Sequence, residues 1–214
     1  SGDYYDYLSL NGSCLALAIG DVAGKGISAA LLMATVQSSL RTQITACLQA
    51  TSGPPGRHDG MDSARLVSQL NQQLYAFTSA EKFATFYFGV YDCGTGRLSY
   101  TNAGHPPPIV IRNGSVIRLE TNGTVVGAFP FAEYDESTFD LQTGDLLACF
   151  TDGITEPENE YGEMFGEDRL IDVLLKHSER DTNEIIDAVI QAVRDWTGSP
   201  ELQDDMTLLV ARRV

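Results

Sequence analysis

Basic residues are scarce in this sequence. Lysine and arginine together number 14 against 29 aspartates and glutamates, which gives a formal net charge of −15 over 214 residues. Proteins that bind nucleic acid neutralise phosphates with basic side chains, and anionic membrane surfaces attract the same side chains. The composition therefore argues against a nucleic-acid partner, against direct membrane contact, and against a phosphodiesterase that acts on nucleic acid.

Cysteine and histidine patterns that bind metals are also missing. The four cysteines show no Cys-x-x-Cys spacing, and the three histidines include no close pair. Zinc sites and disulfide frameworks need such spacing, so neither is expected. No apolar run approaches the roughly 18 residues of a membrane span, and no signal peptide is evident. These absences predict a cytoplasmic protein.

The stretch "GDVAGKG" at residues 20–26 resembles a phosphate-binding loop but fails its pattern. A P-loop requires a glycine five positions before the glycine of its Gly-Lys pair, and a hydroxyl residue directly after the lysine. Those positions hold Ile19 and Gly26 here. The nucleotide interpretation is therefore weak. Asp21 remains as an acidic residue at the end of an apolar strand, where a glycine-rich turn leads into a helix.

Hydrophobic periodicity predicts many short strands and four helices. The strands alternate at a period of two, and the helices show apolar residues at intervals of three and four. The expected strands cover 4–10, 14–20, 83–92, 97–104, 108–112, 116–120, 137–142, 145–152 and 206–214. The expected helices cover 27–48, 63–77, 167–177 and 183–197, and 152–166 is expected to be a polar loop.

Many antiparallel strands with two separated helix pairs favour an α+β fold over a doubly wound parallel sheet. Strands around Asn11-Gly12, around 93–96 and around Asn113-Gly114 are predicted hairpins, and 137–142 and 145–152 lie on either side of Thr143-Gly144. The expected architecture is a sandwich of two antiparallel sheets with a helix pair on each outer face. We expect a single domain over 1–214. Because the chain begins at Ser1 without a methionine, we also expect it to be a fragment of a longer protein.

Aspartates stand at four strand boundaries. They are Asp3, Asp21, Asp152 and the pair Asp204 and Asp205. Glycine adjoins three of these places and permits the close backbone approach that a crowded ion site needs. Hard divalent cations prefer oxygen ligands, and a carboxylate that bridges two ions serves in-line attack on phosphorus. Each aspartate taken alone is more typical of a turn residue than of a metal ligand. The spacing alone therefore leaves two interpretations open, a metal site and a set of turn residues.

Histidine, serine and tyrosine side chains near these motifs have simpler interpretations. His105 in "NAGHPP" follows a strand and precedes three prolines, so we interpret it as structural. Ser28 has no Gly-x-Ser-x-Gly surroundings and is interpreted as a helix-start residue. Tyr4 and Tyr5 are expected to pack.

Five longer segments follow one another along the chain. They are "SGDYYD", "IGDVAGKGISAALLMA", "TFYFGVYDCGTGRLSYTNAGHPPP", "TGDLLACFTDGITEPENEYGEMFGEDRL" and "QDDMTLLV". In this order the chain closely resembles bacterial metal-dependent protein phosphatases of the PPM family, in the SpoIIE and RsbU branch. The resemblance covers residues 1–214. It implies an α-β-β-α sandwich with a dinuclear Mn²⁺ or Mg²⁺ site at its edge.

The resemblance also implies the metal ligands. They are Asp3, Asp21, the backbone carbonyl of Val22, Asp152 and Asp204. Asp21 is the residue that bridges the two ions, and Asp21 and Asp152 are the implied catalytic residues. Asp205 is the reserve assignment for Asp204, and Glu156 is a candidate contact to a metal or its water.

The implied activity is hydrolysis of phosphoserine or phosphothreonine on a bacterial regulatory protein, by a metal-activated water and without a covalent phosphoenzyme. The implied substrate is an anti-sigma-factor antagonist, the implied upstream partner is a sensor or receiver domain, and a homodimer stays open. The alternative is a non-catalytic interaction module with the same fold. All four expected aspartates are present, which counts against that alternative.

Two departures from the family pattern concern the start of the chain. The first motif reads Ser-Gly-Asp where Gly-Gly-Asp is commoner. No arginine stands near the start to bind a substrate phosphate, as it does in eukaryotic relatives. Recognition of the phosphate therefore falls more heavily on the metals and on other surfaces.

Overall fold

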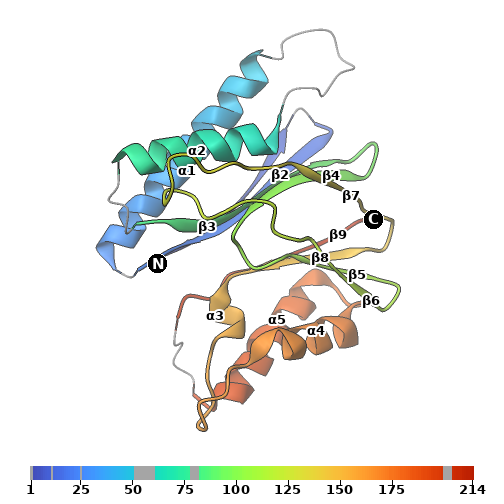
Figure 1. Ribbon diagram of the computed structural model, residues 1–214. Helices are drawn as coiled ribbons and strands as arrows, with labels where there is room; N and C mark the ends of the chain where they lie inside the picture. The colour runs from blue at the N-terminus through green and yellow to red at the C-terminus, as the bar shows by residue number, and fades with distance from the viewer. Residues whose placement is uncertain (1, 11, 25, 51–60, 78–81, 200–203) are drawn as a thin grey trace. The chain divides into compact units, whose positions relative to one another are not determined.

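The computed structural model describes residues 2–10, 12–24, 26–50, 61–77, 82–199 and 204–214. The chain divides into two compact units. The first comprises Ser1–His105 and Thr121–Asp140, and the second comprises Pro106–Glu120 and Leu141–Val214. Each unit contains one antiparallel sheet and one pair of long helices (Figure 1). This content confirms the predicted α+β class with two sheets and two helix pairs.

The first unit is built on a five-stranded sheet with the order β1-β2-β3-β4-β7, in which all neighbours are antiparallel. Its strands are β1 (Asp3–Leu10), β2 (Cys14–Val22), β3 (Ala84–Asp92), β4 (Arg97–Ala103) and β7 (Ser137–Asp140). The structure confirms the pairing of the first two predicted hairpins, β1 with β2 and β3 with β4. Asn11 of the first turn lies outside the described residues.

Helices α1 (Ile27–Ala50) and α2 (Ser63–Phe77) cover one face of this sheet (Figure 1). Apolar residues one turn apart on α1, such as Val36 and Leu40, are fully buried. They belong to one core cluster with residues of α2 and with Phe88 of β3. Both helix predictions are confirmed, and α1 extends two residues beyond its expected end.

A buried carboxylate ties α1 to the sheet. Asp6 in β1 is 8% exposed and accepts two hydrogen bonds from the guanidinium of Arg41 in α1, at 2.8 Å from Nε and 3.0 Å from Nη2. The hydroxyl of Tyr4 donates to the same carboxylate at 3.0 Å. Burial, followed by the charge of Asp6, raises the pKa of Tyr4. This paired geometry fixes which turn of α1 lies against β1.

The second unit is built on a four-stranded antiparallel sheet with the order β6-β5-β8-β9. Its strands are β5 (Ile109–Arg112), β6 (Ser115–Arg118), β8 (Leu146–Phe150) and β9 (Leu208–Arg212). Helices α4 (Gly166–His177) and α5 (Thr182–Thr197) pack on this sheet through a second core cluster (Figure 1). The predicted hairpin of β5 and β6 is confirmed, and both helices agree with their predictions to within one residue.

The strands on either side of Thr143-Gly144 do not form a hairpin with each other. β7 pairs with β4 in the first unit, whereas β8 lies between β5 and β9 in the second. The two strands differ in character, because every residue of β8 is buried while β7 alternates between exposed and half-buried positions. A fully buried strand fits the middle of a sheet and an alternating strand fits an edge.

Two local expectations were wrong. Tyr5 does not pack: it is 59% exposed, whereas Tyr4 is 7% exposed. Successive side chains of a strand point to opposite faces, so the two tyrosines could not both face the core. The stretch 152–166 is not a loop throughout, because it begins with the short helix α3 (Asp152–Thr155).

All four cysteines are free thiols, as the spacing predicts. Burial raises the pKa of the Cys149 thiol to about 12, so this residue behaves as a small apolar side chain. Among the described residues, no helix combines the length and the apolar character that crossing a membrane requires.

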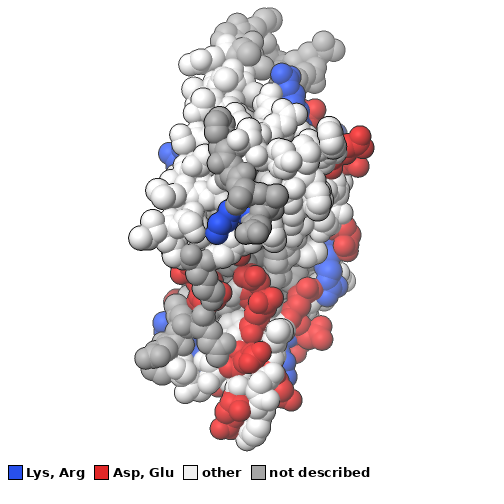
Figure 2. All heavy atoms as spheres, turned by 60° about the vertical axis from the view of Figure 1, so that its left-hand side comes forward, with Lys and Arg blue, Asp and Glu red and all other residues white. Residues whose placement is uncertain are grey.

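Charge is divided unevenly between the units. The second unit holds 18 acidic and 8 basic residues, a net charge of −10, and the first holds 11 and 6, a net charge of −5. In Figure 2, Asp and Glu side chains gather in the lower half of the view. Helices α1 and α2 carry only two charged residues, Arg41 and Arg65. Electrostatic repulsion among the excess acidic side chains is therefore greater within the second unit than within the first.

Candidate functional site

The end of the β1–β2 hairpin brings two predicted ligands together. Asp3 is the direct partner of Asp21 in the register of the two strands, and both residues are half-buried. Side chains at directly opposed positions share a face of the sheet, with Cβ atoms about 5 Å apart. Two carboxylates in this position repel each other, and a cation between them removes that cost. The pair therefore fits a cation site.

Gly2 leaves room beside this pair. A Cβ atom on Gly2 would lie 2.9 Å from Oδ1 of Asp21 and 3.2 Å from the carbonyl oxygen of Val22. These two oxygens, both predicted ligands, thus converge on one point. The backbone N–H of Val22 donates to the carbonyl of Gly2 at 3.2 Å and holds the two segments together. The missing side chain is what permits this close approach of oxygens.

The second unit places Asp152 beside the segment that precedes β9. Thr151, buried at the end of β8, donates its N–H to the carbonyl of Thr207 at 3.1 Å, and its hydroxyl accepts from the N–H of Thr207 at 3.1 Å. Gly153 lies so close to the same segment that a Cβ atom on it would be 1.8 Å from the carbonyl oxygen of Asp205. The Asp-Gly motif and the closing aspartates are therefore in contact through their backbones.

Glu156 lies near two predicted ligands of the second unit. Local desolvation of its carboxyl, with the negative charges of Asp152 and Asp204, raises the pKa of Glu156, although the residue as a whole is exposed. Its N–H donates to the carbonyl of Asp152 at 2.8 Å. The carboxylate of Asp204 accepts from the N–H of Asp205 at 2.9 Å. Carboxylates thus gather at this end of the second unit.

The predicted ligand set draws on both units. Asp3, Asp21 and Val22 belong to the first unit, and Asp152 and Asp204 belong to the second. Within either unit, the described part of the chain has no group of three acidic, histidine or cysteine side chains arranged to hold a metal ion. The assignment of the five ligands, with Glu156 and Asp205 as accessory residues, therefore stays a prediction.

His105 lies in a buried network next to the strand that carries Asp21. It is 2% exposed, and its Nδ1 is 2.9 Å from Oγ1 of Thr85, the partner of Asp21 in the β2–β3 register. The amide of Asn102 holds the backbone of His105, accepting from its N–H at 2.8 Å and donating to its carbonyl at 3.1 Å. These contacts support the structural interpretation of His105.

Lys82 is a residue that the sequence reasoning missed. Its Nζ lies 3.3 Å from the position that a Cβ atom on Gly24 would take, in the turn that follows Asp21. The ammonium also donates to the hydroxyl of Ser28, in the first turn of α1, at 3.4 Å. A lone lysine just before a strand carries no sequence signal. Its position became visible only with the register that sets β3 against β2.

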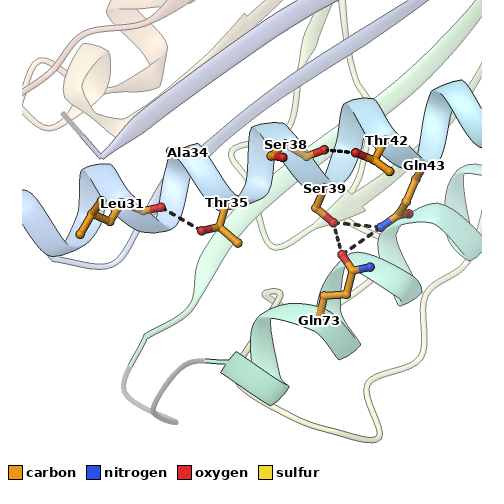
Figure 3. A pocket seen from close by; sticks show the side chains of 8 residues that line it. All are labelled: Leu31, Ala34, Thr35, Ser38, Ser39, Thr42, Gln43 and Gln73. Atoms are coloured by element: carbon orange, nitrogen blue, oxygen red, sulfur yellow. Dashed lines mark hydrogen bonds between the residues drawn. The ribbon is translucent and has the colours of Figure 1, made fainter.

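A groove of about 540 Å³ runs along α1 beside α2 (Figure 3). Hydrogen bonds from Ser39 and Gln43 of α1 to Gln73 of α2 cross it. The groove is lined by aliphatic, hydroxyl and amide side chains, namely Leu31, Ala34, Thr35, Ser38, Ser39, Thr42, Gln43 and Gln73. None of these side chains is a carboxylate or titrates near neutral pH, so the groove is not the place of the predicted chemistry.

Comparison with known proteins gives the family. The model of the family described as Stage II sporulation protein E (SpoIIE) matches residues 11–214. Protein IcfG of Synechocystis sp. is 31% identical over 228 residues, covering all of this chain and 36% of IcfG. Phosphoserine phosphatase RsbU of Bacillus subtilis is 30% identical over 220 residues, covering all of this chain and 59% of RsbU. The chain thus spans about a third to three-fifths of the length of these curated relatives.

The fold has solved counterparts. The SiaA-PP2C domain of Pseudomonas aeruginosa superposes with a TM-score of 0.83 at 21% sequence identity, over 99% of this chain and 80% of that one. This likeness confirms the predicted fold class, that of PP2C phosphatase domains. The match of the family model over residues 11–214 shows that this chain belongs to the SpoIIE family, in the PPM-type phosphatase group.

Proposed function

We propose that this chain is a metal-dependent phosphatase that hydrolyses phosphoserine or phosphothreonine in another protein. Membership of the SpoIIE family supports the proposal, since the relative RsbU is named a phosphoserine phosphatase. The solved structural neighbour RsbX is in complex with magnesium. The observation in this structure that carries the proposal is the opposed pair Asp3 and Asp21, with the oxygens of Asp21 and Val22 converging beside Gly2.

The proposed cofactors are two divalent ions, Mn²⁺ or Mg²⁺. Carboxylate and carbonyl oxygens suit such hard cations. When bound, the ions would supply an activated water for in-line attack on phosphorus and would offset the charge of the phosphoryl group. The proposed ligands are Asp3, Asp21, the carbonyl of Val22, Asp152 and Asp204, with Asp21 as the bridging residue.

The surrounding residues keep these ligands in place. The hairpin register holds Asp3 opposite Asp21. The reciprocal hydrogen bonds of Thr151 and Thr207 hold the end of β8 at the segment before β9. Preorganised ligands cost less ordering free energy when the ions and the substrate bind.

The proposed substrate is a phosphorylated regulatory protein of the anti-sigma-factor antagonist type. We further propose that residues 1–214 form one catalytic domain of a longer regulatory protein with an upstream sensor or receiver domain. The partial coverage of IcfG and RsbU is consistent with such an arrangement. A cytoplasmic location and a homodimer stay predictions.

Hydrolysis of p-nitrophenyl phosphate with and without Mn²⁺ tests the proposal. The wild type is expected to turn over only with metal, and Asp21→Asn and Asp152→Asn are each expected to lower kcat by at least about 100-fold, because a ligand or its charge is lost. Asp140→Asn is the matched control, since this exposed carboxylate pairs with Arg97 on the surface. Metal-dependent turnover that survives both ligand changes would contradict the assignment. No turnover and no metal-induced rise in melting temperature would favour the non-catalytic module.

A further inference from the structure

A phosphorylated side chain brings close to two negative charges to its site. The proposed site is already rich in carboxylates, and the chain has no arginine near its start. Metal ions offset part of this charge, but a substrate also needs a donor that recognises its phosphate oxygens. The described basic residues of the first unit are therefore worth comparing, because Asp3 and Asp21 lie in that unit.

Of the four described basic residues, Arg65 is exposed in the first turn of α2, and two others are engaged away from the hairpin end. Arg41 holds Asp6 at 2.8 Å under α1, and Arg97 pairs with Asp140 at 3.1 Å at the far end of β4. Lys82 differs, because its ammonium is directed at the turn that follows Asp21. The position of the Lys82 ammonium beside this turn therefore indicates a role near the proposed ligands.

The backbone around Lys82 is fixed on two sides. The N–H of Ala23 donates to the carbonyl of Phe83 at 2.9 Å, which joins the residue after Lys82 to the turn. The carbonyl of Lys82 lies 3.2 Å from the position that a Cβ atom on Gly127 would take. Lys82 itself is half-buried. Its ammonium therefore projects from an ordered backbone, not from a free loop end.

Gly24 in the turn that Lys82 faces has close neighbours on two sides. Gly24 has a φ of 109°, which disfavours any other residue, and a side chain there would meet the ammonium at 3.3 Å. The carbonyl oxygen of Gly24 lies 3.5 Å from the Cβ position of Gly2, the same point on which the oxygens of Asp21 and Val22 converge. Lys82 thus approaches Gly24 from one side, and the carbonyl of Gly24 lies beside the point on which the proposed ligands Asp21 and Val22 converge.

We propose that Lys82 is a phosphate-binding residue, whose Nζ donates a charge-assisted hydrogen bond to a phosphoryl oxygen of the substrate. This inference rests on the proposed function. The ammonium already donates to the hydroxyl of Ser28 at 3.4 Å, and a phosphoryl oxygen would accept a shorter, charge-assisted hydrogen bond from it. A lysine binds phosphate as a point charge and tolerates some variation in the position of the group.

Binding of inorganic phosphate to the Mn²⁺-loaded protein tests Lys82 without requiring turnover. The variants are Lys82→Met, Lys82→Arg and the matched control Lys176→Met, which removes the same charge from the exposed last turn of α4. Calorimetry is expected to show phosphate binding weakened about 10- to 100-fold in Lys82→Met, the range for a lost hydrogen bond to a charged group. Lys82→Arg should retain most of the affinity, and Mn²⁺ affinity should stay within about twofold in all three, because Lys82 is not a ligand.

Turnover of p-nitrophenyl phosphate by the same proteins separates the two proposals. A parallel loss of kcat/KM in Lys82→Met, with Lys176→Met unchanged, would support both. Phosphate binding and kcat/KM that are alike in Lys82→Met and Lys176→Met would overturn the role of Lys82 and leave the phosphatase proposal standing. A wild type that binds Mn²⁺ but shows neither turnover nor phosphate binding would overturn both.

Discussion

Two glycines, Gly2 and Gly153, lie where the chain approaches predicted ligands most closely. Gly2 and Gly153 are not turn residues chosen for a positive φ; each is a point where another segment occupies the space of a side chain. At Gly2 that segment presents oxygens of Asp21 and Val22, and at Gly153 it presents the carbonyl of Asp205. Both contacts join a predicted ligand to its neighbour. A single methyl group at either place must therefore displace a candidate ligand.

Gly2→Ala is expected to weaken Mn²⁺ binding by about tenfold or more while leaving the fold intact. The added Cβ would lie 2.9 Å from Oδ1 of Asp21 and 3.2 Å from the carbonyl oxygen of Val22, so at least one ligand has to move. A shift of 1.4 kcal/mol in binding free energy corresponds to this tenfold change. Calorimetric titration with Mn²⁺ measures it.

The control for that change is Gly94→Ala in the β3–β4 turn. Its Cβ would meet only the carboxylate of Asp92, at 3.2 Å, at the opposite end of β3 from the residue that pairs with Asp21. Equal Mn²⁺ affinities for the two alanine variants would show that the space beside Gly2 has no part in metal binding.

Single residues were predictable from the sequence where the chain itself places their neighbours. The Asn-Gly turn and the alternation of β1 and β2 suffice to bring Asp3 near Asp21, because the hairpin partners are adjacent in sequence. Lys82 was missed because its neighbours Gly24 and Ser28 lie more than 50 positions earlier in the chain. Only the pairing of β2 with β3 brings them together, and no local pattern encodes that pairing.

Among the elements, β5 and β8 are joined by a buried ion pair. Asp145, 2% exposed and directly before β8, accepts hydrogen bonds from Arg112 at the end of β5, at 2.9 Å from Nε and 2.6 Å from Nη2. The N–H of Gln142 adds a bond at 2.7 Å. Burial alone would raise the pKa of Asp145, but the hydrogen bonds from Arg112 and Gln142 outweigh it, so the pKa is lowered.

Asp145→Asn is expected to destabilise the protein by about 3 kcal/mol at pH 7, because it leaves the partly buried Arg112 without its countercharge. A carboxylate with a lowered pKa stabilises the folded state above its unfolded pKa, near 3.9, and this stabilisation is lost as the pH falls through the folded value. The difference between wild type and variant should therefore shrink below about pH 4. Urea unfolding at pH 7, 5 and 3.5 measures it.

An exposed ion pair provides the comparison for Asp145. The carboxylate of Asp140 and the guanidinium of Arg97 both stand well exposed, at 70% and 59%. Asp140→Asn should cost less than about 1 kcal/mol at any pH. If Asp145→Asn cost no more than this control, or if its cost were independent of pH, the buried pair would not be stabilising.

The sequence predicted which segments form helices and strands better than it predicted which strands pair with each other. The long helices and the Asn-Gly hairpins carry strong local signals, and they are where predicted. The separation of β7 from β8 could not be anticipated, because Thr143-Gly144 looks like a hairpin turn and the sheet that each strand joins depends on distant strands. Helix α3 is four residues long, too short for a helical period to be recognised.

For the whole molecule, the acid excess and the proposed ions act on stability in opposite directions. The chain carries a net charge of −15. Carboxylates lie close together in each unit, Asp3 with Asp21 in the first and Glu156 with Asp152 and Asp204 in the second. Without metal these carboxylates repel one another, and this repulsion lowers the stability of the folded state. Divalent ions that bind only the folded state remove it and add about 2.7 kcal/mol of stability at 100 times their dissociation constant.

The stability order of wild type and ligand variants should consequently invert with metal. In buffer with chelator, Asp21→Asn and Asp152→Asn are each expected to equal or exceed the wild type, by up to about 1 kcal/mol, since one repelling charge is gone. With saturating Mn²⁺ the wild type should gain the full increment and each variant much less. Thermal melts of the three proteins and of the control Asp140→Asn, with and without Mn²⁺, measure both halves of the prediction.

The pattern among the variants carries the decisive information, because the two aspartates belong to different units. If ligands from both units bind the same ions, either change removes the gain in stability. A metal-induced shift that is lost in Asp21→Asn but fully kept in Asp152→Asn would confine the ions to the first unit, and the proposed set of five ligands would have to be reduced to Asp3, Asp21 and Val22. The proposed set of five ligands instead predicts that the metal-induced shift is lost in both variants and kept in Asp140→Asn. That result would mean that Asp21 and Asp152 are both needed to bind the metal ions.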